Sequence, residues 1–199
     1  SMRLVAQAAH ILQKRYPNIH YHLYSGNADD VGERLDKGLL DFGILIEPFD
    51  RKKYDSLRLP VRERWGVLMR KDSPLADCDY ITPDDLKDKP LLHSRQSKVQ
   101  DGIQAWFGYD IEELNIVGTY NLLYNASLMV EEGVCYALCL DKLINTTGDS
   151  NLCFRPLINQ VTAGIDLVWK KYQVFSKAAD KFLEIMREQM IPHENGTLS

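Results

Sequence analysis

The alternation of apolar and polar residues at the start of the chain predicts a helix, a strand, a second helix and a second strand. Residues 2–16 carry an apolar stripe at helical spacing, made of Leu4, Val5, Ala8, Ile11 and Leu12. Residues 19–25 alternate like a strand with two different faces, and residues 42–46 form the continuous apolar run of a strand covered on both sides. Between them, Asn27 can cap a helix that ends before Gly38. Strands that alternate with helices predict a mostly parallel sheet.

The same alternation continues on both sides of an extended stretch, residues 57–70, which Pro60 is expected to break. Thr82 followed by Pro83 has the pattern of a helix start. We expect the other strands at residues 91–93, 115–120, 134–140, 152–157 and 164–170. We expect the other helices from residues 94–98 through 107, at residues 122–132, and after Ser176 as far as residue 190.

These elements predict an α/β fold with two Rossmann-like lobes joined by two crossover strands. The last helix has no strand of its own, so we expect it to pack on the first lobe. The first lobe would comprise residues 1–64 and 169–199, and the second residues 65–168. A cleft between two such lobes is a usual site for a small ligand.

Composition narrows the class of function. The chain has 199 residues with a net charge of −4, so we expect that it does not hold DNA through phosphate contacts. No apolar run is long enough to span a bilayer, and no basic-then-apolar leader is present, which favours a cytoplasmic protein with no membrane contact.

The reactive side chains do not form a catalytic or metal-binding pattern. Four cysteines without C-x-x-C spacing favour free thiols in the core, and they are Cys78, Cys135, Cys139 and Cys153. His20 and His22 share a strand face without a third ligand nearby in the sequence. No nucleophile elbow or glycine-rich phosphate loop occurs. We therefore expect no enzyme activity, no metal and no cofactor.

Six short motifs occur in one order along the chain. The first are Tyr16-Pro17-Asn18-Ile19 and Leu35-Asp36-Lys37-Gly38-Leu39-Leu40-Asp41-Phe42, and the others lie at residues 70–76, 81–92, 130–134 and 167–171. Each motif alone is weak, but together they resemble the effector-binding domain of LysR-type transcriptional regulators over residues 2–190. The resemblance implies a fold like that of type 2 periplasmic binding proteins. It also implies a domain that binds a small metabolite and relays its presence to a DNA-binding domain.

The resemblance further implies which loops contact the effector. In the first lobe these loops contain Gly26, Asn27, Ile46, Glu47 and Pro48. In the second lobe they contain His93, Ser94, Arg95, Gln96, Tyr120 and Asn121. Arg95 could pair with a carboxylate, and amides near helix starts attract anions, so the effector could be an anionic organic molecule. The alternative remains that Asn27 is only a helix cap and Arg95 only a solvated charge. An apolar residue at position 46 favours a partly hydrophobic effector.

Three departures from the family and one alternative function bear on this interpretation. The winged helix-turn-helix domain and the first strand of the effector domain are absent from this chain, so DNA would be bound only through the missing domain. A late glycine and a proline of the family are replaced by Cys135 and Leu140.

Family members form homodimers or tetramers, and here the dimer would use the helices at residues 2–16 and 122–132. The alternative function is a free-standing solute-binding protein of the same fold, which predicts a secretion leader.

Overall fold

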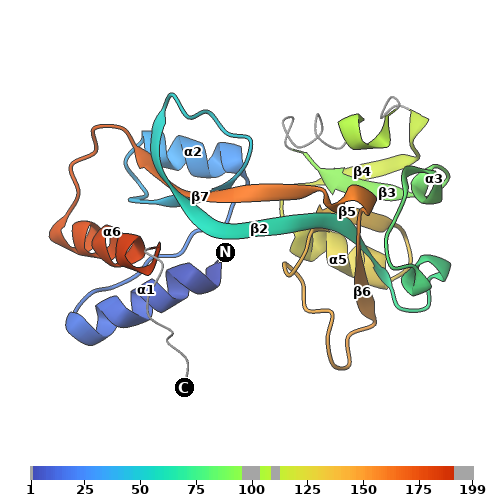
Figure 1. Cartoon of the computed structure of the whole chain (residues 1–199), viewed down its shortest axis with the longest axis horizontal. Helices are drawn as coiled ribbons and strands as arrows, with labels where there is room; N and C mark the ends of the chain where they lie inside the picture. The colour runs from blue at the N-terminus through green and yellow to red at the C-terminus, as the bar shows by residue number, and fades with distance from the viewer. Residues whose placement is uncertain (1, 96–103, 109–112, 191–199) are drawn as a thin grey trace, which may run out of the picture. The chain divides into compact units, whose positions relative to one another are not determined.

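The computed structural model describes residues 2–95, 104–108 and 113–190 (Figure 1). Contacts between residues divide the chain into two compact units. The first unit contains Ser1–Ser25, Asp30–Val61 and Gly164–Ser199, and the second contains Gly26–Asp29 and Arg62–Ala163, as far as these residues are described.

The first unit is a small sheet with helices packed on it. Strand β1 (Gly43–Ile46) pairs antiparallel with β7 (Thr162–Lys170), and β7 neighbours β2 (Tyr54–Arg70). Helices α1 (Met2–Arg15) and α6 (Lys177–Met190) pack together in one apolar core that includes Leu12, Leu59, Leu167 and Met186. The prediction that the last helix belongs to the first half is therefore confirmed.

Helix α2 (Ala28–Asp36) packs closely on β1 because Gly43 has no side chain. A methyl group at Gly43 would lie 2.8 Å from Cγ1 of Val31 and 3.1 Å from Cδ1 of Leu35. The helix is followed by Gly38 at φ 68°, the left-handed conformation that glycine adopts at low cost. The predicted helix end is therefore confirmed.

Among its described residues, the second unit contains the rest of β2 and four further strands. These are β3 (Leu91–Ser94), β4 (Ile116–Tyr120), β5 (Tyr136–Leu140) and β6 (Leu152–Pro156). The strand order is β2-β5-β3-β4, and β6 pairs with β2. Helix α5 (Leu123–Glu131) packs its Ala126 and Val130 into one core, and the short helices η1 (Pro74–Asp77) and α3 (Pro83–Leu86) pack into the other. A 3₁₀ turn, η3 (Ile158–Gln160), precedes β7.

The sheet is mixed, so the prediction of a mostly parallel sheet is wrong. Strand β3 is parallel to β4 and β5, but β2 is antiparallel to β5 and β6, and β1 is antiparallel to β7. Parallel neighbours need a crossover connection, usually a helix. The segments that precede β2, β6 and β7 contain no α-helix.

Two further expectations are wrong. Pro60 does not break the extended stretch but lies exposed within β2, where its missing N–H is tolerated. Residues 19–25 belong to no strand, and Leu23 is 84% exposed. Their alternation shows which side chains share a face, but a strand also needs a hydrogen-bonding neighbour, and sequence pattern does not reveal one. The helix expected from residues 94–98 through 107 lies partly outside the described residues. Within its described part, residues 104–107 are helical.

Local capping agrees with the sequence where the side chains are described. The Thr82 hydroxyl accepts from the Asp85 N–H, and the Asp85 carboxylate accepts from the Thr82 N–H, which forms a capping box. The Ser176 hydroxyl accepts from the Ala179 N–H at the start of α6. The four cysteines are free thiols, and all but Cys78 are buried.

Candidate functional site

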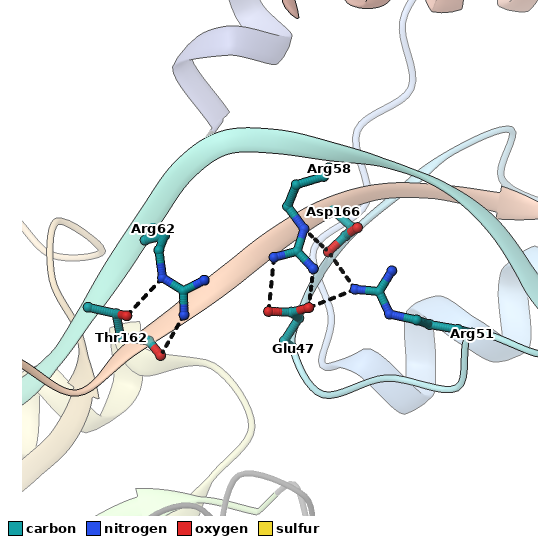
Figure 2. Close-up of polar contacts among 6 residues, drawn as sticks. All are labelled: Glu47, Arg51, Arg58, Arg62, Thr162 and Asp166. Carbon is teal, nitrogen blue, oxygen red and sulfur yellow. Dashed lines mark hydrogen bonds and ion pairs between the residues drawn. The ribbon is translucent and has the colours of Figure 1, made fainter.

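Four charged side chains of the first unit gather where β1 ends (Figure 2). Glu47 directly follows β1, and its N–H donates to the carbonyl of Gly164 on β7 at 3.0 Å. Asp166 lies on β7, Arg58 on β2, and Arg51 in the connection between β1 and β2. We call Glu47, Arg51, Arg58 and Asp166 the charged cluster.

Within the charged cluster, each of the two carboxylates forms an ion pair with both arginines. Both terminal nitrogens of Arg58 donate to the carboxylate of Glu47, one of them at 3.0 Å. The Nε of Arg58 lies 3.1 Å from Oδ2 of Asp166. Arg51 donates to Glu47 at 2.7 Å and lies 3.6 Å from the same Asp166 oxygen. Two carboxylates thus balance two guanidinium groups.

Burial differs sharply within the cluster. The side chain of Asp166 is 0% exposed, whereas that of Glu47 is 29% and that of Arg58 42% exposed. The carboxylate oxygens of Asp166 have no hydrogen-bond partner of good geometry among the described residues, so the ion pairs to the two arginines compensate its charge. Asp166 therefore anchors the cluster from the interior, while Glu47 and the two arginines are in part exposed to solvent.

The ionisation of Glu47 and Arg58 follows from these contacts. Hydrogen bonds from Arg58 hold the pKa of Glu47 below its ordinary value, against the opposing effect of desolvation. The hydrogen bond to Glu47 in turn raises the pKa of Arg58. Both groups are therefore fully charged at neutral pH, and the pair is a charge-assisted, bidentate one.

Gly164 makes room for this pair. A methyl group at Gly164 would overlap both Nη1 of Arg58 and Oε2 of Glu47. Since the backbone of Gly164 also accepts the N–H of Glu47, one residue of β7 holds the main chain of Glu47 and leaves space for its side chain.

The second unit brings the other predicted residues together at the ends of two parallel strands. Ser94 on β3 is in register with Tyr120 on β4, and the Arg95 N–H donates to the Tyr120 carbonyl at 2.9 Å. The Tyr120 hydroxyl donates to the Leu138 carbonyl at 2.6 Å, and burial raises its pKa well above 10. His93 and Ser94 are buried, and Nδ1 of His93 lies 2.8 Å from the Ser94 carbonyl. Carboxyl ends of parallel strands commonly bind ligands.

The remaining predicted residues have simpler surroundings. Gly26 and Asn27 are half-buried immediately before α2, and Ile46 is half-buried at the end of β1. Pro48 follows Glu47 through a cis peptide bond and is exposed. Of the predicted site residues described in the second unit, Arg95 and Asn121 are exposed, and the Oδ1 of Asn121 accepts from the Leu122 N–H at 2.9 Å. Gln96 lies outside the described residues.

Sequence reasoning missed Arg51, Arg58, Gly164 and Asp166. One signal was available, because Asp166 is the only charged residue in the run Gly164-Ile165-Asp166-Leu167-Val168-Trp169. A carboxylate inside an apolar strand needs a partner, and that requirement would have pointed to nearby arginines. The sequence did not indicate which arginines these were.

Other kinds of site find no support in the part of the chain that the structure describes. No group of three or more His, Cys, Asp or Glu side chains there could hold a metal ion. Within the same residues, no helix has the length and apolar character needed to cross a membrane. A cavity of about 10 Å³ in the second unit, lined in part by Leu68, Cys139 and Phe154, has room for about one water molecule.

Comparison with known proteins gives one consistent family. The family model described as LysR substrate binding domain matches residues 1–191. The chain is 27% identical over 188 residues to the uncharacterized HTH-type transcriptional regulator YvbU of Bacillus subtilis, covering 88% of this chain and 59% of that protein. It is 25% identical over 190 residues to the uncharacterized regulator YfeR of Shigella flexneri, covering 95% and 61%. The chain thus spans about three fifths of the length of these relatives.

Solved structures agree on the fold. The effector-binding domain of QuiR in complex with shikimate matches with a TM-score of 0.78 at 16% identity, over 93% of this chain and 89% of that one. The effector-binding domain of a BenM variant matches with a TM-score of 0.71 at 20% identity, over 93% and 87%. The expected α/β fold of the type 2 periplasmic-binding-protein kind is confirmed by these likenesses.

Proposed function

The chain belongs to the family of LysR substrate-binding domains, and on this basis we propose that it binds a small organic effector and relays its presence to the rest of a bacterial transcription regulator. The observation that carries the proposal is the family match over residues 1–191, which leaves only the last eight of 199 residues unmatched. Members of this family are regulatory domains and not enzymes.

We assign the effector contacts to one group of residues in each unit. In the first unit, Ile46 ends β1 and Glu47 directly follows it. Asn27, which precedes α2, belongs to the second unit. In the second unit, Ser94, Arg95 and Tyr120 lie at the ends of β3 and β4. Backbone amides at a helix start and the Arg95 guanidinium both favour an anionic group, and Ile46 favours an apolar one. The proposed ligand is therefore a small organic acid with an apolar part.

Thermal and chemical unfolding with a panel of organic acids tests this function. A ligand present at 100 times its dissociation constant should raise the free energy of unfolding by about 2.7 kcal/mol. Shikimate belongs in the panel because QuiR was solved with it. Substitution Arg95→Ala should weaken binding of the acid that stabilises the protein, whereas Lys87→Ala, which removes an exposed cation of the same unit, should leave it unchanged. A panel without any stabilising acid would contradict the proposal.

We propose that DNA binding belongs to a part of the regulator outside these 199 residues. The relatives are HTH-type regulators that are longer than this chain, and the chain itself has a net charge of −4. An acidic domain gains little from contact with phosphates. The 199-residue protein should show no specific binding to its own promoter at physiological salt in a mobility-shift assay. A regulator of transcription works beside DNA, so we also place it in the cytoplasm.

We propose that the domain forms a homodimer through α1 and α5. The outward face of α5 carries Tyr124, Leu128 and Met129, which are 67%, 45% and 43% exposed. The opposite face of α5 is buried through Leu123, Ala126, Ser127 and Val130. Exposed apolar side chains that lie together on one helix face favour self-association.

Light scattering at micromolar concentration tests the dimer. A mass of twice 22.9 kDa is expected for the wild type. Leu128→Glu should shift the protein toward the single-chain mass, because a charge would be buried in the interface. Val174→Glu is the control, since Val174 is 94% exposed but lies outside α1 and α5. A single-chain mass for the wild type at all concentrations would contradict the dimer.

A further inference from the structure

The charged cluster contains a guanidinium group that already binds a carboxylate. Resting on the proposed function, we propose that Glu47 occupies the Arg58 guanidinium in the ligand-free domain, and that the carboxylate of an organic-acid effector replaces Glu47 there. The ligand class is thus a carboxylate, and Glu47 sets how readily it enters.

The first step of the argument is the geometry of Arg58. Its two terminal nitrogens both donate to one carboxylate, which is the arrangement by which arginine binds small organic acids. Its third nitrogen, Nε, lies 3.1 Å from the fully buried carboxylate of Asp166. Asp166 therefore fixes the guanidinium plane from the interior and keeps the paired terminal nitrogens directed toward Glu47.

The second step is that the Glu47 carboxylate can move away from Arg58 without becoming a buried, unpaired charge. Its side chain is 29% exposed, so water can solvate the carboxylate, and Arg51 donates to it independently at 2.7 Å. Asp166 by contrast is 0% exposed and stays bound between the two arginines. Of the two carboxylates that compensate Arg58, only Glu47 is able to exchange.

The third step is the space that the fold reserves for the pair. Gly164 lies under both Arg58 and Glu47, where any larger residue would collide with them. Ile46, directly before Glu47, packs against the apolar core of the first unit and so fixes the backbone from which Glu47 projects. Benzoate presents the same two carboxylate oxygens as Glu47 and therefore serves as the probe.

Binding of benzoate, measured by calorimetry against wild type and variants, tests the inference. When a binding group is free only part of the time, its apparent affinity for a ligand is multiplied by the fraction of time for which it is free. Substitution Glu47→Gln should therefore tighten benzoate binding by about tenfold or more. Neutral benzamide, which has the same shape, should gain nothing. The double variant Glu47→Gln with Arg58→Gln should lose the gain.

Two controls separate binding at Arg58 from general electrostatics and from misfolding. Glu33→Gln removes one negative charge from the same unit, where Glu33 pairs with Lys37 on the surface, and it should not change benzoate binding. In the folded wild type, the Arg58 Nε–H resonance should shift on addition of benzoate but not of benzamide. Equal affinities for wild type and Glu47→Gln, or an equal gain with Glu33→Gln, would overturn the inference.

The outcome is separable from that of the proposed function. The benzoate comparison is made between variants, so it can be interpreted even if no metabolite of the panel stabilises the wild type. An effector that binds the wild type and Glu47→Gln equally well, with benzoate also unchanged, would overturn the role of Glu47 and leave the proposed function standing.

Discussion

The charged cluster of the first unit is held by ion pairs between side chains, whereas Tyr120 and His93 at the strand ends of the second unit contact backbone carbonyls. Arg58 and Glu47 can each take another partner of the right charge. Tyr120 instead donates to a carbonyl of its own sheet, and Nδ1 of His93 faces the carbonyl of the next residue. A charge pair at the surface is exchangeable, while a buried hydrogen bond to the backbone is costly to leave unmade. The first unit is thus suited to respond to a ligand, and the second to hold its loops in place.

Removing one arginine should give the largest loss of stability, because it leaves Asp166 buried with too little compensation. We expect Arg58→Met to lower the free energy of unfolding by about 3 kcal/mol in urea titrations. The matched change in the second unit is Arg64→Met, which breaks the more exposed pair with Asp141 and should cost about 1 kcal/mol or less. Equal losses at both sites would remove the distinction between the two units.

Filling the space under the charged cluster should have the next largest effect. Gly164→Ala should cost about 1 kcal/mol, the low end for added bulk, since the partly exposed ends of Arg58 and Glu47 must both move. Gly118→Ala in the second unit meets only the end of the Leu92 side chain at 3.0 Å and should cost less. Denaturant titration of both variants gives the comparison, and a neutral Gly164→Ala would show that the pair does not depend on this close fit.

A loss of similar size is expected when the second unit loses one neutral hydrogen bond. Tyr120→Phe leaves the Leu138 carbonyl without this donor and should lower the free energy of unfolding by about 1 kcal/mol. Tyr124→Phe, at an exposed position of α5, should change it very little. Urea titration of both variants gives the comparison, and an equally small change with Tyr120→Phe would show that this hydrogen bond contributes nothing to stability.

The smallest effect is the dependence of stability on pH through Glu47. Its pKa is lowered in the folded protein below the ordinary 4.5, chiefly by the hydrogen bonds from Arg58. The stability that Glu47 contributes is therefore complete above pH 4.5 and is lost as the pH falls through the lowered value. The difference in unfolding free energy between wild type and Glu47→Gln should be constant near neutral pH and shrink in acid. A difference that persists in strong acid would assign the effect to packing.

Sequence pattern predicted the helices, most strands and the family, but not the pairing of the strands. The helix stripe of α1 and the helix starts at Thr82 and Ser176 depend on residues close together in the chain, and these predictions are confirmed. The antiparallel pairing of β1 with β7 joins Gly43 to Val168, and no local pattern specifies such a distant neighbour. For the same reason the resemblance indicated Glu47 but not its partners Arg58 and Asp166.

The long strand β2 has a consequence for the order in which the chain folds. Residues 54–61 of β2 belong to the first unit and residues 62–70 to the second, and nearly the whole second unit lies within residues 62–163. Pairing β1 with β7 in the unfolded chain must close a loop over all of those residues, at an entropic cost that grows with loop length. A second unit that folds first would shorten the loop and lower that cost. Amides of β3 and β5 should therefore gain protection before those of β1 in pulsed hydrogen exchange.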